Sequence, residues 1–327
     1  MIFQVEISSV CNARCVYCPL TVLHEKWNFR FMEINLFDKF IEEARELRPE
    51  YIHLQGWGEP LLHPNFDKFV KKSLEVSKAG ITTNATLLDS KLDVVADLDV
   101  VAITFAGATP ATHEKYRVGC PFYKVVSNAK ILAKKKRGRL IAIYMLIRDN
   151  YRELPDFIDL AADVGFDEVK ISNVNYLPNA EVAELKAFTD LFERSNSELE
   201  RKIEEASNRS KDKGLRFASD YPSPRELTEC PERPTTTLFI NVDGEVSPCV
   251  YLNLPIREAA IPRIFNNKEY KVPKVVYGKI GQQPLKEIIK KASSFTAKFV
   301  YRRYNIELGN LAEPPTVCLT CYRLYGV

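Results

Sequence analysis

The most informative stretch of this chain is Ser8-Ser9-Val10-Cys11-Asn12-Ala13-Arg14-Cys15-Val16-Tyr17-Cys18-Pro19. Its cysteines, Cys11, Cys15 and Cys18, follow the spacing Cys-x3-Cys-x2-Cys directly behind an alternating apolar run. Three thiolates can hold three corners of a four-iron, four-sulfur cube and leave the fourth iron without a protein ligand. An open coordination position separates a catalytic metal centre from a structural one, so the triplet predicts a catalytic iron–sulfur cluster.

A zinc site and a disulfide framework are the alternatives for these three cysteines. Zinc usually takes paired Cys-x2-Cys units closed by a fourth ligand, and His24 is the only nearby candidate for that role. Disulfides are disfavoured because Met1 leads straight into a strand-like run, with no basic segment and no apolar stretch of secretory length.

The triplet resembles the hallmark of the radical S-adenosylmethionine (SAM) superfamily. The resemblance implies that the amino and carboxylate groups of SAM bind the open iron, and that reductive cleavage of SAM yields a 5′-deoxyadenosyl radical. In that family an aromatic residue before the last cysteine lies beside the adenine, and Tyr17 occupies this position. An electron donor such as ferredoxin or flavodoxin is the implied partner.

Bulk composition agrees with a soluble enzyme. The chain has 327 residues, 46% apolar and 27% charged, and no apolar run of the length needed to span a bilayer. Its net charge of +3 arises from 46 basic and 43 acidic side chains, a balance that does not suggest nucleic acid as a partner. Eight cysteines without an export signal favour metal ligation in a reducing, cytoplasmic compartment.

The first half of the chain alternates strand-like and helix-like patterns. Amphipathic stretches separate short apolar runs, which lie at 3–7, 51–54, 81–83, 100–105, 141–147 and 169–171. Repeated βα units with buried strands indicate an α/β fold, either an open doubly wound sheet or a barrel. The family resemblance implies the second form, a partial (β/α)6 barrel with SAM at the carboxyl ends of the strands.

Motifs at two strand ends strengthen the resemblance. Gln55-Gly56-Trp57-Gly58-Glu59-Pro60 is similar to the family's Gly-Gly-Glu-Pro segment, which binds the amino group of SAM. Trp57 separates the two glycines, a departure that leaves Gly58 and Glu59 in register. Thr83-Asn84-Ala85 resembles Thr-Asn-Gly, with alanine in place of the usual glycine.

The fourth strand end carries a more divergent motif. The family commonly has Ser-x-Asp-Gly where this chain has Thr104 to Gly107, with the hydroxyl directed toward the ribose or carboxylate of SAM. Thr104 keeps a hydroxyl, but Ala106 lacks the carboxylate. Arg117 matches a family arginine that pairs with the SAM carboxylate through its fork of donors.

Residues 173–222 show less regular patterns. A charged helical pattern runs from 184 to 213, with Gly214 as its stop, and 215–218 is expected to form a last short strand. The proline pair Pro222 and Pro224 predicts a domain boundary. We therefore expect a barrel over 1–222 and a smaller domain over 223–327.

The smaller domain carries a second cysteine set, Cys230, Cys249, Cys318 and Cys321. Asp243-Gly244 between alternating apolar residues predicts a hairpin before Cys249. Four thiolates suit either zinc or a fully ligated iron–sulfur cube. The pattern resembles the SPASM extension and its shorter twitch form, in which a hairpin and a helix carry auxiliary clusters. It implies one auxiliary [4Fe-4S] cluster, whereas Cys120 has no spaced partner and is expected to be a buried or loop thiol, not a ligand.

These features favour an oxidising radical SAM enzyme whose auxiliary cluster accepts an electron from the substrate. The substrate is a small molecule, a cofactor precursor, or a peptide or protein; the short segment before Cys11 mildly favours the non-peptide classes. The segment 250–317 is expected to line the substrate mouth or to buttress the barrel. A non-catalytic electron carrier or a zinc protein is the alternative from another class.

Overall fold

The computed structural model describes residues 1–310 and 312–327, and its main feature is one ten-stranded sheet. The spatial order of its strands is β14-β11-β10-β1-β3-β4-β5-β7-β8-β9. Their bounds are β1 (Ile2–Val5), β3 (Tyr51–Leu54), β4 (Lys78–Thr83), β5 (Val100–Phe105), β7 (Arg139–Leu146), β8 (Glu168–Asn173), β9 (Arg216–Ser219), β10 (Thr237–Ile240), β11 (Glu245–Ser247) and β14 (Gly278–Lys279). Two small ribbons pair β2 (Arg14–Cys15) with β6 (Arg117–Val118) and β12 (Ala260–Phe265) with β13 (Lys268–Pro273).

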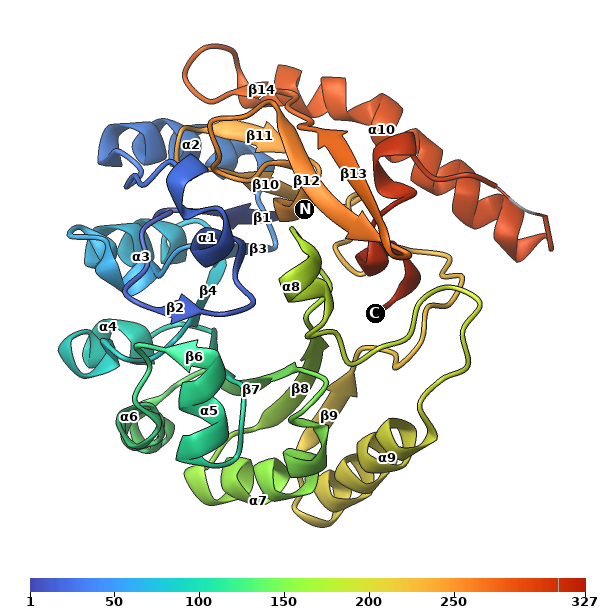
Figure 1. Ribbon diagram of the computed structural model, residues 1–327. Helices are drawn as coiled ribbons and strands as arrows, with labels where there is room; N and C mark the ends of the chain where they lie inside the picture. The colour runs from blue at the N-terminus through green and yellow to red at the C-terminus, as the bar shows by residue number, and fades with distance from the viewer. Residues whose placement is uncertain (311) are drawn as a thin grey trace.

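Most helices cover the outer face of this sheet, while α8, β12 and β13 lie on its inner side (Figure 1). The α-helices are α1 (Pro19–Val22), α2 (Ile34–Leu47), α3 (Phe66–Leu74), α4 (Leu92–Ala96), α5 (Pro110–Tyr116), α6 (Phe122–Lys135), α7 (Leu154–Val164), α8 (Ala180–Ala183), α9 (Ser197–Asp212) and α10 (Leu285–Glu307). The 3-10 turns are η1 (His24–Lys26), η2 (Pro60–Leu62), η3 (Leu88–Ser90), η4 (Tyr151–Glu153), η5 (Val250–Leu252), η6 (Thr316–Cys318) and η7 (Tyr322–Tyr325). No helix in the described part of the chain is long and apolar enough to cross a membrane.

The six expected strands are confirmed as β1, β3, β4, β5, β7 and β8, and each pairs in parallel with its neighbours. Side chains alternate between the two faces of every strand. Phe3 of β1 is fully buried and packs edge-on against Phe40 of α2, with ring centroids 5.1 Å apart. Gln4 and His53 occupy the opposite, inner face. The parallel register brings the loops after all six strands to one edge of the sheet.

The prediction of one long helix over 184–213 is wrong in the first half of that range. After α8 the chain takes turns and bends until α9 begins at Ser197. Asn196 caps α9, since its side-chain oxygen accepts from the backbone N–H groups of Glu198 and Leu199 at 3.0 and 3.2 Å. Phe192, with φ of +70°, breaks the helical path before that cap. The predicted stop is confirmed: α9 ends at Asp212, and Gly214 has φ of +70°.

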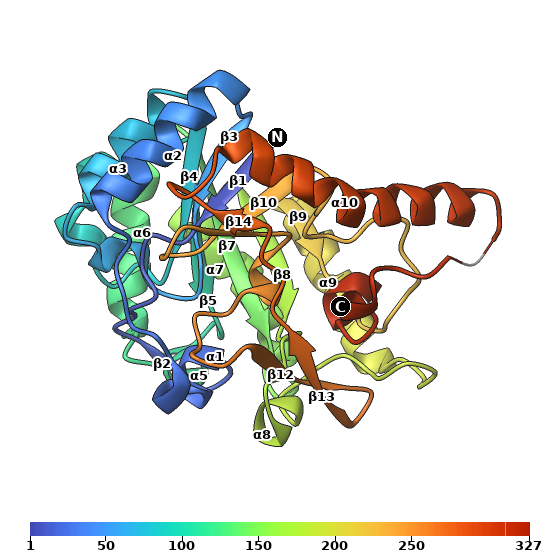
Figure 2. The same ribbon diagram turned by 90° about the horizontal axis from the view of Figure 1, so that it is seen from above.

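The carboxyl-terminal segment extends the barrel sheet. β10 lies parallel to β1, and the predicted hairpin joins β10 to β11 through Gly244, whose φ is +82°. The segment then forms the β12–β13 ribbon and α10, which begins beside α2 and extends past the carboxyl terminus (Figure 2). Phe299, in the middle of α10, packs with Cys230. Leu254, Ile256 and Ile261 pack with Leu20 and Trp27 of the cysteine-triplet loop, so this segment buttresses the barrel.

Candidate cluster and SAM site

The loop between β1 and α2 carries the cysteine triplet. Within this loop β2 pairs antiparallel with β6, which follows α5, and this pairing places Cys15 opposite Arg117. The backbone N–H of Cys18 donates to Cys15 O at 3.0 Å, and α1 begins at the next residue, Pro19. Trp27 supports the loop from behind because its indole N–H donates to Ser9 O at 2.9 Å.

Burial dominates the ionisation of two of these thiols. It raises the pKa of Cys11 to about 11 and raises the pKa of Cys18 further. Cys15 differs, because hydrogen bonding with the Cys120 thiol, aided by the charge of Arg117, lowers its pKa to about 6. Cys120 is buried, as predicted, but its position beside Cys15 was not expected. Bound iron favours thiolate, so ligation would offset the cost of deprotonating the buried thiols.

Arg117 lies behind the triplet as a buried cation. It is 5% exposed, and its terminal N–H donates to Tyr17 Oη at 2.9 Å. Its Nε has no hydrogen-bond partner, and the described residues supply no carboxylate to pair with it. The charge of Arg117 favours the thiolate of the neighbouring Cys15, and a buried guanidinium without an ion-paired carboxylate fits anionic groups bound nearby.

Glu59 joins the loops that follow β3 and β4. It is 2% exposed, and burial raises its pKa. Its Oε1 accepts from Leu61 N at 3.1 Å and from Thr83 Oγ1 at 2.6 Å, and its Oε2 accepts from Asn84 N at 2.8 Å. Both carboxylate oxygens of Glu59 therefore accept hydrogen bonds from the protein itself in this structure.

Glycine is needed at the approach of this loop to the triplet. A Cβ on Gly58 would lie 2.3 Å from Ser8 O and 2.6 Å from Val10 O, which no side chain allows. Asn84 reaches the same segment, since its side-chain N–H donates to Asn12 Oδ1 at 2.9 Å. Ala85, where the family usually has glycine, adopts φ of +61°, so the chain keeps the left-handed turn at a cost in strain.

Thr104, within β5, and Ala106, directly after β5, belong to the divergent motif. Thr104 Oγ1 donates to Thr83 O at 3.3 Å and also lines the cavity inside the barrel. Ala106 is fully buried, and its carbonyl accepts from Asn150 Nδ2 at 3.0 Å. Ala106 thus fills an apolar position where the family has an aspartate.

A cavity with about 1550 Å³ of empty volume occupies the barrel interior, and we call it the lumen cavity. Of the residues singled out from the sequence, Tyr17, Cys18 and Thr104 line it, whereas Gly58, Glu59, Asn84 and Arg117 lie outside its lining. Sequence reasoning missed several polar residues on its wall. Alternation along the strands could have found them, and they include Gln4, His53, Thr82 and Lys170.

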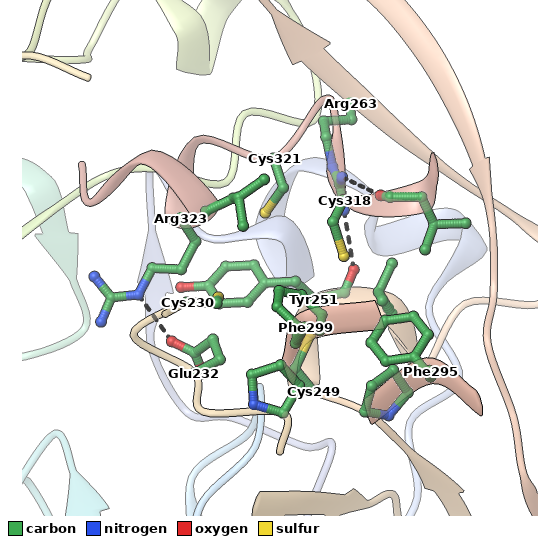
Figure 3. Close-up of a pocket in the computed structure, with 15 residues that line it drawn as sticks. Cys230, Glu232, Cys249, Tyr251, Arg263, Phe295, Phe299, Cys318, Cys321 and Arg323 are labelled. Carbon is green, nitrogen blue, oxygen red and sulfur yellow. Dashed lines mark hydrogen bonds and ion pairs between the residues drawn. The ribbon is translucent and has the colours of Figure 1, made fainter. Parts of the chain in front are cut away.

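The second cysteine set converges from three separate parts of the chain, because Cys318 and Cys321 share one loop. Cys230, Cys249, Cys318 and Cys321 line one cavity with about 370 Å³ of empty volume, which we call the four-cysteine cavity (Figure 3). Phe295, Phe299 and Leu324 form much of its apolar wall. Burial raises the pKa of Cys318 to about 12 and raises the pKa of Cys230 and Cys249 further. No three His, Cys, Asp or Glu side chains of the described residues converge as single-ion ligands, and four thiols around a cavity fit a larger group.

Arg263 of β12 connects the segments that form the four-cysteine cavity. It is 3% exposed and donates to Val317 O at 3.2 Å and to Tyr251 O at 3.4 Å (Figure 3). It also donates to Thr320 O at 3.4 Å. Its partners belong to the Cys318–Cys321 loop and to the turn after Cys249, so one side chain joins both halves of the set. Among the described residues it has no carboxylate partner. This buried positive charge suits a negatively charged cluster between the thiols.

Comparison with protein families agrees with both sites. Residues 5–161 match the model of the radical SAM superfamily, and residues 230–322 match the model of SPASM, an iron–sulfur cluster-binding domain.

Individual relatives support the same family. The chain is 26% identical over 316 residues to a tungsten-containing aldehyde ferredoxin oxidoreductase cofactor-modifying protein of Pyrococcus furiosus, covering 91% of this chain and 83% of the relative. It is 26% identical over 277 residues to a PqqA peptide cyclase of Gluconobacter oxydans, covering 79% and 72%. The crystal structure of Streptococcus suis SuiB bound to S-adenosylmethionine has a similar fold, with a TM-score of 0.69 at 16% identity, covering 99% of this chain and 71% of that one.

Proposed function

The chain belongs to the radical SAM superfamily and ends in a SPASM iron–sulfur domain, and from this premise we propose that it oxidises a peptide or a cofactor precursor held between its two clusters. It is an enzyme that uses a [4Fe-4S] cluster, SAM and an auxiliary iron–sulfur cluster. With these bound, the amino-terminal centre supplies a 5′-deoxyadenosyl radical that abstracts hydrogen from the substrate. The alternative of a non-catalytic electron carrier or a zinc protein is not retained.

The observation that carries this proposal is the wall shared by the two cavities. Glu232, Tyr251 and Arg323 line both the lumen cavity and the four-cysteine cavity. Tyr251 also packs against Trp57 of the strand-end loop, with ring centroids 5.9 Å apart. A substrate in the lumen therefore lies one layer of side chains from the second centre. A cluster held by the four cysteines would supply a one-electron acceptor there, so that a substrate that had lost a hydrogen atom would need only to release a proton and an electron for a two-electron oxidation.

We propose Cys11, Cys15 and Cys18 as ligands of the catalytic cluster, and Cys230, Cys249, Cys318 and Cys321 as ligands of the auxiliary cluster. Four thiols from distant segments around one cavity, with an uncompensated guanidinium beside them, support the second set. The barrel over 1–222 and the auxiliary domain over 223–327 remain our proposed division. The stretch from Tyr221 to Thr236 forms neither helix nor strand, which supports it.

The proposed SAM contacts are Tyr17, Gly58, Glu59, Asn84, Thr104 and Arg117. Tyr17 and Thr104 face the lumen cavity, so they can touch SAM directly. Glu59 and Asn84 hold the loops in place through the hydrogen bonds described above. Arg117 supplies a buried positive charge that forms no ion pair with a described carboxylate, and it donates a hydrogen bond to Tyr17.

Two substrate classes follow from the relatives. The Pyrococcus furiosus protein is described as cofactor-modifying and the Gluconobacter oxydans protein as a peptide cyclase, so this enzyme is proposed to act on one of these two classes. A small electron carrier such as ferredoxin or flavodoxin is proposed to supply the reducing electron and to collect the electron from the auxiliary cluster.

The test is SAM cleavage by the anaerobically reconstituted enzyme with dithionite. The wild-type chain should form 5′-deoxyadenosine, and Cys15→Ala should not, because the catalytic cluster loses a ligand. Cys318→Ala should still form it, since the triplet is untouched, but should yield no oxidised product. Because loss of a metal ligand can unfold a small domain, circular dichroism must first show that this variant is folded. A folded Cys318→Ala variant that makes product at the wild-type rate would contradict the electron-acceptor role.

A further inference from the structure

The lumen cavity contains more positive than negative charge. Its charged lining residues are Lys170, Glu232, Arg233 and Arg323. Arg323 is neutralised within the chain, because it pairs with Asp220 and with Glu232, each at 2.8 Å. The same contact accounts for Glu232, which leaves Lys170 and Arg233. Neither has a side-chain hydrogen bond or an ion pair with any described residue.

Lys170 lies inside the barrel. It is half-buried in the middle of β8, with Ile143 of β7 and Ala218 of β9 as its neighbours in register. Ile143 and Met145 form the apolar surface beside it in the cavity. Arg233 is exposed and reaches the cavity from the loop before β10. A cation on a partly dry wall, with no counter-ion of its own, favours an anionic ligand.

The polar residues contributed by β3 and β4 hold no compensating negative charge. Thr82 donates to Gln55 Oε1 at 3.1 Å, so His53 must donate its Nε2–H to Thr82, at 2.9 Å, and accept from Tyr51 Oη at Nδ1, also at 2.9 Å. Burial, reinforced by the charge of Lys170, lowers the pKa of His53 to about 4, so the imidazole is neutral near pH 7.

Within this network the hydroxyl and imidazole donors are all paired, and only the side-chain amide of Gln55 keeps unpaired donors. The side-chain N–H groups of Gln55 have no partner among the described residues, and they line the same cavity as Lys170. The network also explains a glycine of β4. A Cβ on Gly80 would lie 1.9 Å from Tyr51 Oη, so glycine is required for the tyrosine to reach His53.

We propose that the lumen cavity binds an acidic group of the substrate, a carboxylate or a phosphate, with Lys170 as its counter-ion and Gln55 as a hydrogen-bond donor. This inference rests on the proposed function, since it places the substrate in the lumen, and it narrows the substrate to an anionic molecule. A peptide would supply a carboxylate, and a cofactor precursor would supply a phosphate or a carboxylate.

Isothermal titration of the anaerobically reconstituted enzyme, saturated with SAM, tests the site with two probes, inorganic phosphate and glutarate. Saturable binding of at least one probe is expected. Lys170→Met should weaken it by about tenfold or more, because a hydrogen bond to a charged group is lost, while Lys170→Arg should preserve most of it. Lys130→Met removes an exposed lysine of α6 and is the matched control, in which affinity should not change.

Three outcomes would overturn the proposal. They are the absence of binding by either probe, equal affinity in wild type and Lys170→Met, and equal weakening in Lys170→Met and Lys130→Met. SAM affinity measured in the same variants separates an alternative role: a loss of SAM binding in Lys170→Met with unchanged anion binding would assign the lysine to SAM. Failure of the anion site in a wild-type enzyme that still forms 5′-deoxyadenosine would leave the proposed function standing.

Discussion

Replacing Glu59 by glutamine should destabilise the fold even when SAM is absent. The carboxylate of Glu59 accepts three hydrogen bonds, from the backbone N–H groups of Leu61 and Asn84 and from the hydroxyl of Thr83. Glutamine keeps one acceptor oxygen and turns the other into an N–H donor. If its oxygen faces Leu61 and Thr83, its amide nitrogen meets the N–H of Asn84, and the opposite orientation leaves the N–H of Leu61 unpaired.

The expected magnitude follows from that count. One buried N–H group loses its acceptor at a site that is 2% exposed. Such a loss costs about 1 to 3 kcal/mol, and a chain of this size then melts roughly 1.5 to 4.5 °C lower. Thermal unfolding followed by circular dichroism, without SAM and again after reconstitution, measures the change.

Glu184→Gln is the control, because Glu184 is exposed and its side chain makes no hydrogen bond with a described residue. Iron content should be unchanged in both variants, and SAM affinity should fall in Glu59→Gln. An unchanged melting temperature combined with weaker SAM binding would refute the reasoning. It would show that the carboxylate serves the ligand and not the junction between the two loops.

Three further results are expected. Anaerobic reconstitution should load about eight irons per chain, and about four when the whole amino-terminal triplet is changed to alanine; a wild-type value near four with bound zinc would contradict the auxiliary cluster. Arg263→Gln should lower the reduction potential of the auxiliary cluster by roughly 90 mV, corresponding to about 2 kcal/mol for a charge at partly screened short range, while Arg263→Lys should shift it less. Electron paramagnetic resonance during a redox titration measures both, and equal potentials in all three proteins would remove the counter-ion role. Burial raises the pKa of Glu6, which is fully buried at the end of β1, from 4.5 to about 8. The folded state therefore holds a proton that the unfolded state releases, so stability should fall as pH rises from about 4.5 to 8, and Glu6→Gln should flatten this decline in urea titrations.

The barrel itself could be read from the sequence because its signals are local. Each strand is a short apolar run and each helix an amphipathic repeat, and both patterns reflect the neighbours of a residue within a few positions. The triplet Cys11, Cys15 and Cys18 is equally local, since its members lie within one loop. The glycine of the Asp243-Gly244 turn is likewise a local signal, because it predicts the positive φ that the backbone adopts at that residue. The wrong helix prediction over 184–196 shows the limit of such local patterns. The charged residues there favour a helix, but the turn at Phe192 and the cap at Asn196 interrupt it.

Only the tertiary structure decided which residues that are far apart in the sequence are neighbours in space. Cys230 and Cys321 share one cavity, Arg263 joins both halves of that cysteine set, and β10 pairs with β1 at the opposite end of the chain. It also revealed that the oxygens of Glu59 accept hydrogen bonds from the chain itself, and that no described residue forms an ion pair with Lys170 in the lumen cavity. These properties depend on packing, burial and charge compensation, to which distant segments contribute together, and no local spacing records them.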